Sequence, residues 1–351
     1  MKAQQILTRT ECTALRGIAI IGIFLHNYCH WLPRIVRENE YQYFQGHIDG
    51  LDSVLSHPDD SLLIHLLSFF GHYGVPVFLF LSAYGLVLKY ESQEERPMEK
   101  YDVRGTVGFL RDHYLKLFKM MFAGFVAFTM VDAVTPGSHH YEFLDIIAQL
   151  FMFNNVLPDP DKIIWPGPYW FFGLMMQLYI VYRLLLYRRH WAWTVGLMVV
   201  CEVIQLCCDP EGEALNRWRY NCIGGMLPFG MGLLTARYGQ RIDRRLALIC
   251  VIPSAYLIYQ FSHGFFYWTL VPLAVIFTGI CLVKALPEKT LPPLVWMGGI
   301  SAALFVTHPI TRKIFIPISR HGDVYAGLLL YVITSVAVAW LFREVMKKVK
   351  K

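Results

Sequence analysis

An arginine and a histidine share one apolar segment near the start of the chain. The segment, residues 9–31, reads RTECTALRGIAIIGIFLHNYCHW, and Arg16 is its only permanently charged side chain between Ala14 and Trp31. A helix would place His26 roughly 15 Å beyond Arg16. An ionisable imidazole at that depth of a bilayer is costly unless it faces a protein interior or a wet cavity. His26 is therefore the first candidate for proton transfer, and the alternative is a structural histidine bonded to a neighbouring helix.

The composition indicates a helical membrane protein with several spans. The 351 residues are 55% hydrophobic and 17% charged, with a mean hydropathy of +0.40. A soluble domain carries about 25% charged residues. The net charge of +6 does not indicate a nucleic-acid partner, because the basic residues cluster in alternate loops, as membrane topology requires. We expect one membrane domain over residues 1–351, surrounded by the lipid bilayer.

Recurring apolar runs predict an all-α transmembrane bundle with about ten spans. Their expected bounds are 14–33, 62–88, 109–133, 169–187, 191–208, 219–238, 246–261, 265–286, 293–317 and 324–342. The segment 143–157 is only moderately apolar and lies between turn clusters, so we expect it to be interfacial or re-entrant. One span fewer or more is the alternative, because the boundaries of such runs are uncertain by a few residues.

Lysine and arginine alternate between rich and poor loops. Loops 34–61, 134–168 and 209–218 hold few, whereas 89–119 and the C-terminal tail hold many. Because basic loops stay in the cytoplasm, we expect both termini there and these three loops outside. The last outer loop is an exception, since Arg312, Lys313 and Arg320 make it basic, and it could be partly buried.

The eight cysteines show neither a CxxC pair nor metal-ligand spacing, and most lie in apolar runs. Cysteine in such runs behaves as a small hydrophobe. We therefore expect neither a disulfide framework nor a metal site.

Further polar residues fall inside the predicted spans. His72 and Ser82 lie in the glycine-rich second span, Asn27 follows His26, and His308 precedes Pro309, which should free nearby backbone carbonyls. The others are His65, Asp132, Gln177, Glu202 and Gln205. For that last group, hydrogen bonding between helices is the simpler explanation, worth on the order of 1 kcal/mol or less.

The start of the third span carries four basic residues, namely Arg111, His113, Lys116 and Lys119. A helix places the last three at neighbouring positions of one face. Anchoring to lipid headgroups is one explanation. The other is a clamp for the phosphates of an anionic cofactor, because Arg offers a bidentate fork and Lys a point charge. Arg16 would lie at a similar level.

Four motifs, in this order, resemble acyltransferase family 3, the integral membrane proteins that O-acylate bacterial glycans. They are LRGIAIIGIFLHN, GHYGVPVFLFLSAYGLVL, PYWFFGLMMQLYIVYRLL and ISAALFVTHP, and the resemblance extends from about Glu11 to Phe342. The family commonly has Arg-x-x-Arg where the third span starts, but this chain has His113-Tyr-Leu-Lys116, which keeps one charge and loses the bidentate fork. Ser82-Ala83-Tyr84 replaces the usual Ser-Gly-aromatic triplet, a smaller departure.

The resemblance implies an O-acyltransferase of the bacterial inner (cytoplasmic) membrane. It would move an acyl group, expected to be acetyl, from acyl-CoA to a sugar hydroxyl of a cell-surface polysaccharide or lipid-linked precursor. His26 would be the general base or a transient acyl carrier, roles that suit an ordinary imidazole pKa near 6.5. The residues implied for the CoA phosphates are Arg16, Arg111, His113, Lys116 and Lys119. Those implied for the acceptor path are Asn27, His72, Ser82, Trp170 and His308.

A membrane transporter or exporter of a glycan or acylated metabolite is the main alternative, because it would also place histidines at mid-membrane depth. The sequence shows no convincing internal repeat, which many transporters contain. A non-catalytic scaffold or sensor would not need Arg16 and His26 in this arrangement. The sequence is compatible with either a monomer or a homodimer.

Overall fold

The computed structural model describes residues 5–91 and 103–349, and within these ranges it contains helices and no strands. Residues 1–4, 92–102 and 350–351 lie outside the described residues. They include both chain ends and most of the charged loop after the second predicted span. The cytoplasmic position of the termini therefore stays a prediction.

Every predicted span corresponds to a helical segment. The segments are α1 (Arg9–Cys29), α3 with η1 and α4 (Leu62–Phe70, Gly71–Tyr73 and Gly74–Tyr90), α5 (Val103–Val134), α8 with the π-helical η4 (Trp170–Val181 and Tyr182–Leu186), α9 (Trp191–Leu206), α11 (Cys222–Tyr238), α12 (Arg244–Phe261), α13 (Phe265–Ala285), α14 (Leu291–Arg320) and α15 (Val324–Val349). Among the described residues, seven segments are long and apolar enough to cross a membrane by length and composition. The helices α9, α11 and α12, with 16, 17 and 18 residues, are not among the seven. The all-α polytopic fold class is confirmed.

Short elements connect these helices. They are α2 (Gln45–Ser56), α6 (Phe143–Leu150), η2 (Asn154–Val156), α7 (Pro160–Ile163), η3 (Gly167–Tyr169), α10 (Glu213–Arg219) and η5 (Glu288–Thr290). The helix α6 has 8 residues. A helix needs about 20 residues to cross a bilayer, so α6 is too short to be a span, as expected for the segment 143–157.

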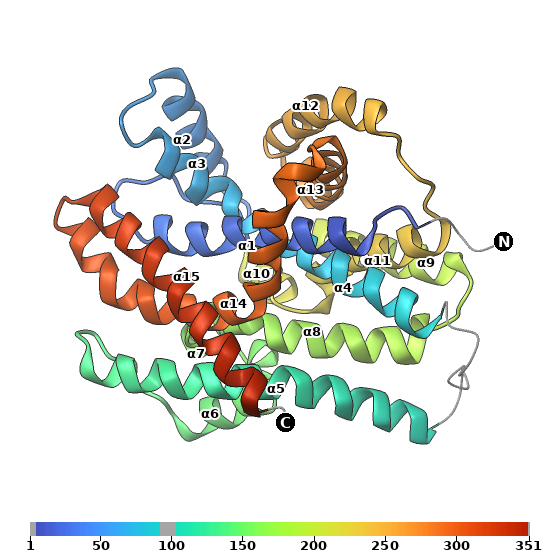
Figure 1. Cartoon of the computed structure of the whole chain (residues 1–351), viewed down its shortest axis with the longest axis horizontal. Helices are drawn as coiled ribbons and strands as arrows, with labels where there is room; N and C mark the ends of the chain where they lie inside the picture. The colour runs from blue at the N-terminus through green and yellow to red at the C-terminus, as the bar shows by residue number, and fades with distance from the viewer. Residues whose placement is uncertain (1–4, 92–102, 350–351) are drawn as a thin grey trace.

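The connections gather at two opposite ends of the long helices. At one end, where α2 and the α14–α15 turn lie on the left of Figure 1, the side-chain pairs are Asp52–Tyr259 and Asp161–Asn216, and the Tyr325 hydroxyl donates to the Asp60 backbone carbonyl. At the other end the pairs are Glu11–Lys284 and Glu91–Arg237. This grouping matches the alternation of charge, because the loops predicted to lie outside contact one another. We call residues 30–61, 135–169 and 207–221 the loop layer.

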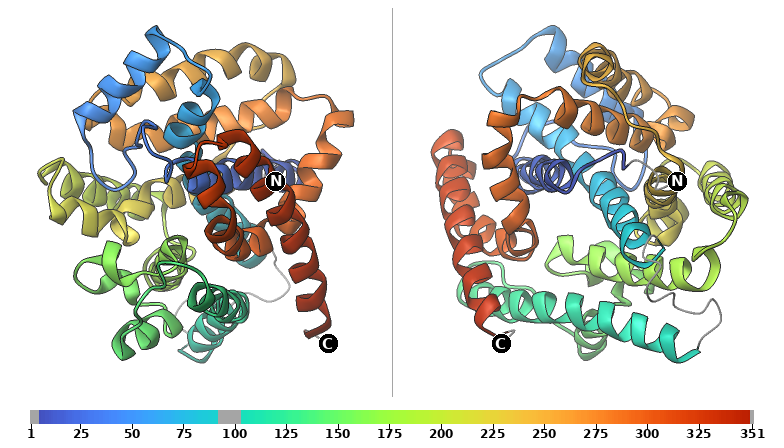
Figure 2. Two further views of the ribbon diagram at one scale, coloured as in Figure 1. Left: turned by 90° about the vertical axis from the view of Figure 1, so that its left-hand side faces the viewer. Right: turned by 45° about the vertical axis from the view of Figure 1, so that its right-hand side comes forward.

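The helix α1 lies inside the bundle, as Figure 2 shows, and packs against α3, η1, α4, α13 and α14. It begins with a capping box in which Thr8 and Glu11 satisfy each other's backbone N–H groups. Glycines let backbones touch along it: a Cβ atom at Gly298 of α14 would lie 1.9 Å from the Thr13 carbonyl oxygen, and one at Gly71 would lie 2.6 Å from the Gly22 oxygen. Such close approach is how membrane helices gain packing energy. It fixes the position of α1.

We expect Gly298→Ala to destabilise the protein, because the added methyl group would overlap backbone and force α1 and α14 apart. Overpacking of this kind costs about 1–3 kcal/mol. The matched control is Gly299→Ala, where the nearest atom is the Arg343 Nη2 atom at 3.8 Å. That change should be neutral or stabilising by up to about 1 kcal/mol through helix propensity. Thermal unfolding of detergent-purified protein measures both, and equal midpoints would contradict the close contact.

Candidate functional site

A cavity of about 310 Å³ lies between the C-terminal end of α1 and the loop layer. Polar side chains from five segments line the cavity, and they are His26, Asn27, His30, Glu38, Glu40, His72, Asp161 and Arg312. Most of the other lining residues are aromatic, and they are Trp31, Tyr41, Trp165, Trp170, Phe171, Tyr220 and Phe305. The cavity therefore combines proton-accepting groups with flat apolar faces.

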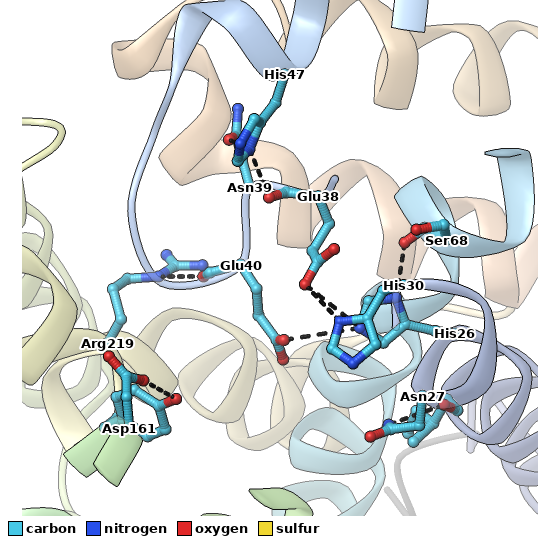
Figure 3. Close-up of polar contacts among 12 residues, drawn as sticks. His26, Asn27, His30, Glu38, Asn39, Glu40, His47, Ser68, Asp161 and Arg219 are labelled. Atoms are coloured by element: carbon cyan, nitrogen blue, oxygen red, sulfur yellow. Dashed lines mark hydrogen bonds and ion pairs between the residues drawn. The ribbon is translucent and has the colours of Figure 1, made fainter. Parts of the chain in front are cut away.

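His26 is buried, and its two ring nitrogens have different surroundings (Figure 3). The Nδ1 atom lies 2.7 Å from the backbone carbonyl oxygen of Ser68. Because a carbonyl oxygen can only accept, Nδ1 must carry the proton of the neutral ring, which leaves a lone pair on Nε2. The Ser68 hydroxyl in turn donates to the Val36 carbonyl at 2.7 Å, so the partner of His26 is itself held. The tautomer with a basic Nε2 is thus set by the backbone.

Two carboxyl groups face this basic nitrogen. The Nε2 atom of His26 lies 3.8 Å from Glu38 Oε1 and 3.9 Å from Glu40 Oε2. His30 donates from Nδ1 to Glu38 Oε1 at 3.0 Å. The two distances from His26 Nε2 exceed those of ordinary hydrogen bonds, so its surroundings are loose enough to admit another atom, whereas the His30–Glu38 distance is that of an ordinary hydrogen bond.

The two carboxyl groups titrate differently. Burial opposes ionisation of Glu38, but the attraction of His26 and His30 and the hydrogen bond from His30 outweigh it and hold its pKa well below the usual value. Burial, followed by repulsion from Glu38, raises the pKa of Glu40 to about 8. At neutral pH one carboxyl group is ionised and the other keeps its proton. Groups whose pKa values are pushed apart in this way can act as base and acid in one site.

The segment that carries both carboxyl groups is held by hydrogen bonds to its backbone. His65 accepts from the Val36 N–H at 3.1 Å, Arg219 donates to the Glu40 carbonyl at 3.1 Å, and Trp268 donates to the Asn39 carbonyl at 2.8 Å. These donors and acceptors come from α3, α10 and α13. His65 is therefore a structural residue, as the sequence suggested.

Stacked aromatic rings form another part of the cavity wall. Tyr41 and Tyr220 stack with ring centroids 4.0 Å apart, and Trp170 meets Tyr41 edge-on at 5.5 Å. The Tyr220 hydroxyl donates to Asp161 Oδ1 at 2.5 Å. The aromatic faces are consequently rigid, and a carboxylate lies beside them.

The residues predicted to line the acceptor path divide into two groups. His26, Asn27, His72 and Trp170 all line the cavity. Two others are absent from its wall. The Ser82 hydroxyl donates to the Phe78 carbonyl of its own helix at 2.7 Å. His308 is buried one turn behind the wall, where its Nδ1 donates to Leu304 at 3.0 Å.

The basic residues predicted for the CoA phosphates lie toward the opposite end of α1. Arg111, Lys116 and Lys119 are exposed near the start of α5. His113 is buried with its ring 4.5 Å from Tyr179, and Arg16 lies within electrostatic range of the same tyrosine. Arg16 and His113 thus both lie near Tyr179, whereas Arg111, Lys116 and Lys119 lie on the exposed side of α5.

Sequence reasoning missed Glu38, Glu40 and Arg312. The pattern RENEY, which places two carboxylates just after the first span, was a usable signal for the glutamates. For Arg312 the signal was the excess of basic residues in the last outer loop. The structure resolves that exception, because Arg312 is buried in α14, where its Nη1 donates to the Asn27 carbonyl at 3.2 Å, and Lys313 pairs with Asp132. Neither residue is a loop charge.

Comparison with protein families matches residues 11–344 to the model of the acyltransferase 3 family, which is described as an acyltransferase domain. The match includes every residue that lines the cavity. No curated protein and no solved structure matches the chain.

The raised pKa of Glu40 predicts a pH-dependent stability. Between the ordinary value of 4.5 and the folded value of about 8, the folded protein keeps a proton that the unfolded chain has lost. Each pH unit of increase in this window should therefore lower the free energy of unfolding by up to ~1.4 kcal/mol. Glu40→Gln removes this contribution, so its thermal midpoint should fall less steeply with rising pH than that of the wild type.

The control is Glu142→Gln, which changes an exposed glutamate of the loop layer. This variant should keep the wild-type slope of midpoint against pH. An identical slope for wild type and Glu40→Gln would show that Glu40 titrates normally.

Proposed function

The chain belongs to acyltransferase family 3, and on that premise we propose that it moves an acyl group, expected to be acetyl, from acyl-CoA to a sugar hydroxyl. The acceptor is a cell-surface polysaccharide or a lipid-linked glycan precursor, and the protein is a multi-pass protein of the bacterial inner membrane. The observation that carries the proposal is the basic Nε2 atom of His26, which faces a cavity lined by carboxyl groups and aromatic rings.

His26 acts as the general base in this scheme. Its Nε2 accepts the proton of the acceptor hydroxyl while that oxygen attacks the carbonyl carbon of the thioester. The C–S bond breaks, and the proton passes from Nε2 to the departing thiolate of CoA. A positioned base contributes about 10² to 10⁴ in rate, and a water-excluding cavity limits hydrolysis of the thioester.

The cavity suits one sugar ring. Its volume of about 310 Å³ is at the lower end of small-molecule sites, so a single ring and the end of the donor would fill it. The faces of Tyr41, Trp170 and Tyr220 can pack on the C–H face of a sugar, and the carboxyl groups can accept from its hydroxyls. The remainder of a longer glycan would extend into the loop layer.

The donor fits a path along α1. Arg16 lies ten residues before His26, which corresponds to roughly 15 Å of helix. Phosphates held by Arg16 and by the basic residues Arg111, His113, Lys116 and Lys119 would leave the extended arm of CoA to span that length and bring its thioester to His26. Binding of the donor phosphates at one end of α1 would then be separated from the transfer reaction at His26.

Substitution His26→Gln should reduce acyl transfer by about 10² to 10⁴, while the protein still binds the donor. Transfer of radiolabelled acetyl from acetyl-CoA to endogenous glycan in isolated membranes measures the first effect. His263→Gln is the control, because His263 contacts Asp52 at the membrane surface and does not line the cavity. Unchanged transfer by His26→Gln would rule out its role as the base.

Substitution Arg16→Ala should weaken acetyl-CoA binding by roughly tenfold or more, since a charge-assisted phosphate contact is worth at least about 1.4 kcal/mol. Calorimetric titration of detergent-purified protein with acetyl-CoA measures it. Arg320→Ala, an exposed arginine at the end of α14, is the control and should bind normally. If the wild type bound no acetyl-CoA, export of a glycan would become the better explanation.

A further inference from the structure

We propose that His26, His30 and Glu38 bind one divalent transition metal ion, such as Zn²⁺, at the polar end of the cavity. The cysteine pattern led us to expect no metal, but the ligands here are imidazole and carboxylate groups. One potential ligand atom from each residue lies within 4.8 Å of the other two. Imidazole nitrogen and carboxylate oxygen are ligands that zinc takes in open sites.

The two histidines have the spacing of a helical metal pair. They are four residues apart at the C-terminal end of α1, and their ring centroids are 4.5 Å apart. Histidines at positions i and i+4 project from one face of a helix, which lets both rings reach a single ion. Glu38 then approaches from the segment that follows the helix, so the chain folds a third ligand back onto the pair.

The distances between ligand atoms already approach those of a tetrahedral site. Ligands about 2.1 Å from a tetrahedral ion stand roughly 3.4 Å from one another. Glu38 Oε1 lies 3.0 Å from His30 Nδ1 and 3.8 Å from His26 Nε2, which brackets this value. Small side-chain rotations would therefore bring the three atoms to one ion without moving α1. For His30 Nδ1 to bind the ion, the proton that it donates to Glu38 would move to Nε2 of the same ring, which has no hydrogen-bond partner among the described residues.

His26 is also oriented as metal ligands are. A ligating histidine commonly donates its second ring N–H to a carbonyl or carboxylate, which fixes the ring and raises its basicity. The bond from His26 Nδ1 to the Ser68 carbonyl at 2.7 Å has this arrangement. The lone pair of Nε2 therefore points toward Glu38 and Glu40.

An independent observation comes from His72. This side chain is 4% exposed and lines the cavity, and its Nε2 atom has no hydrogen-bond partner within residues 5–91 and 103–349. A buried polar atom without a partner is costly, so such groups call for an explanation. The ring lies 5.5 Å from the ring of His26, which makes His72 the candidate fourth ligand. A metal ion would satisfy the unpaired nitrogen.

Metal binding and acyl transfer would compete for one lone pair. A metal ion on Nε2 of His26 prevents that atom from accepting the hydroxyl proton, so the metal should inhibit transfer reversibly. This consequence rests on the proposed function, whereas metal binding itself rests only on the geometry of the cluster.

Metal binding is measured on the chelator-treated full chain in detergent, by calorimetric titration with Zn²⁺ and by the visible absorption of Co²⁺. We expect one ion per chain. His30→Ala and the isosteric Glu38→Gln should each weaken the affinity by roughly tenfold or more, and His72→Ala should weaken it as well. His263→Ala is the matched control, because it removes a second histidine–carboxylate pair, with Asp52 at 3.1 Å, and should bind normally.

A thermal midpoint near that of the wild type verifies that each variant is folded, and Glu38→Gln keeps the side-chain shape if His30→Ala does not fold. Failure of the wild type to bind Zn²⁺ or Co²⁺ would overturn the proposal, as would an affinity that neither His30→Ala nor Glu38→Gln changes. Acyl transfer without metal binding would overturn only the metal site. Metal binding without acyl transfer would support the metal site and count against the proposed function.

Discussion

The hydrogen bond from His26 Nδ1 to the Ser68 carbonyl is the interaction on which the candidate site depends. It decides which nitrogen of the ring is basic, and it requires the backbone of α1 to approach closely the end of α3, which carries Ser68, and the adjoining η1. Gly71 makes that approach feasible, because a Cβ atom there would lie 2.6 Å from both the Gly22 oxygen and the His26 Cβ atom. The small residues in the helix interface therefore allow the contact that orients the His26 imidazole. Packing along α1 and the chemistry at its end cannot be separated.

The same helix keeps two chemistries apart. Its C-terminal end carries His26, where the loop layer supplies carboxyl groups and aromatic rings. Toward its N-terminal end, Arg16 lies within electrostatic range of Tyr179, which contacts His113. Because α1 is a rigid helix, the number of residues between Arg16 and His26 fixes the distance between these two regions. The proposed transfer, with a charged donor bound at one end of α1 and the acceptor at the other, would need such a separation.

The loop layer is as much a part of the site as the membrane helices. Glu38 and Glu40 lie two residues apart and differ in ionisation, because Glu38 is compensated by histidines and Glu40 is buried beside a carboxylate. Their segment is held by Arg219 and Trp268, whose side chains also meet in a cation–π contact of 4.4 Å. The carboxyl groups are thus positioned by residues far along the chain, and this explains how a loop can present groups to His26 with little freedom.

Local sequence determined the helices of this protein, the alternation of its connections, and His26 as the central residue, because apolar run length, charge bias and a buried imidazole are local signals. The family motifs are equally local. The contributions of Glu38, Glu40 and Arg312 were decided only by the tertiary structure, as were the stacking of Tyr41 on Tyr220 and the absence of Ser82 from the cavity lining. Tyr41 and Tyr220 are 179 positions apart (220 − 41), and loops lack the periodicity that reveals which side chains share a face. Helix packing decides which distant side chains meet. Because glycine contacts between different helices set that packing, the sequence of a single segment does not predict it.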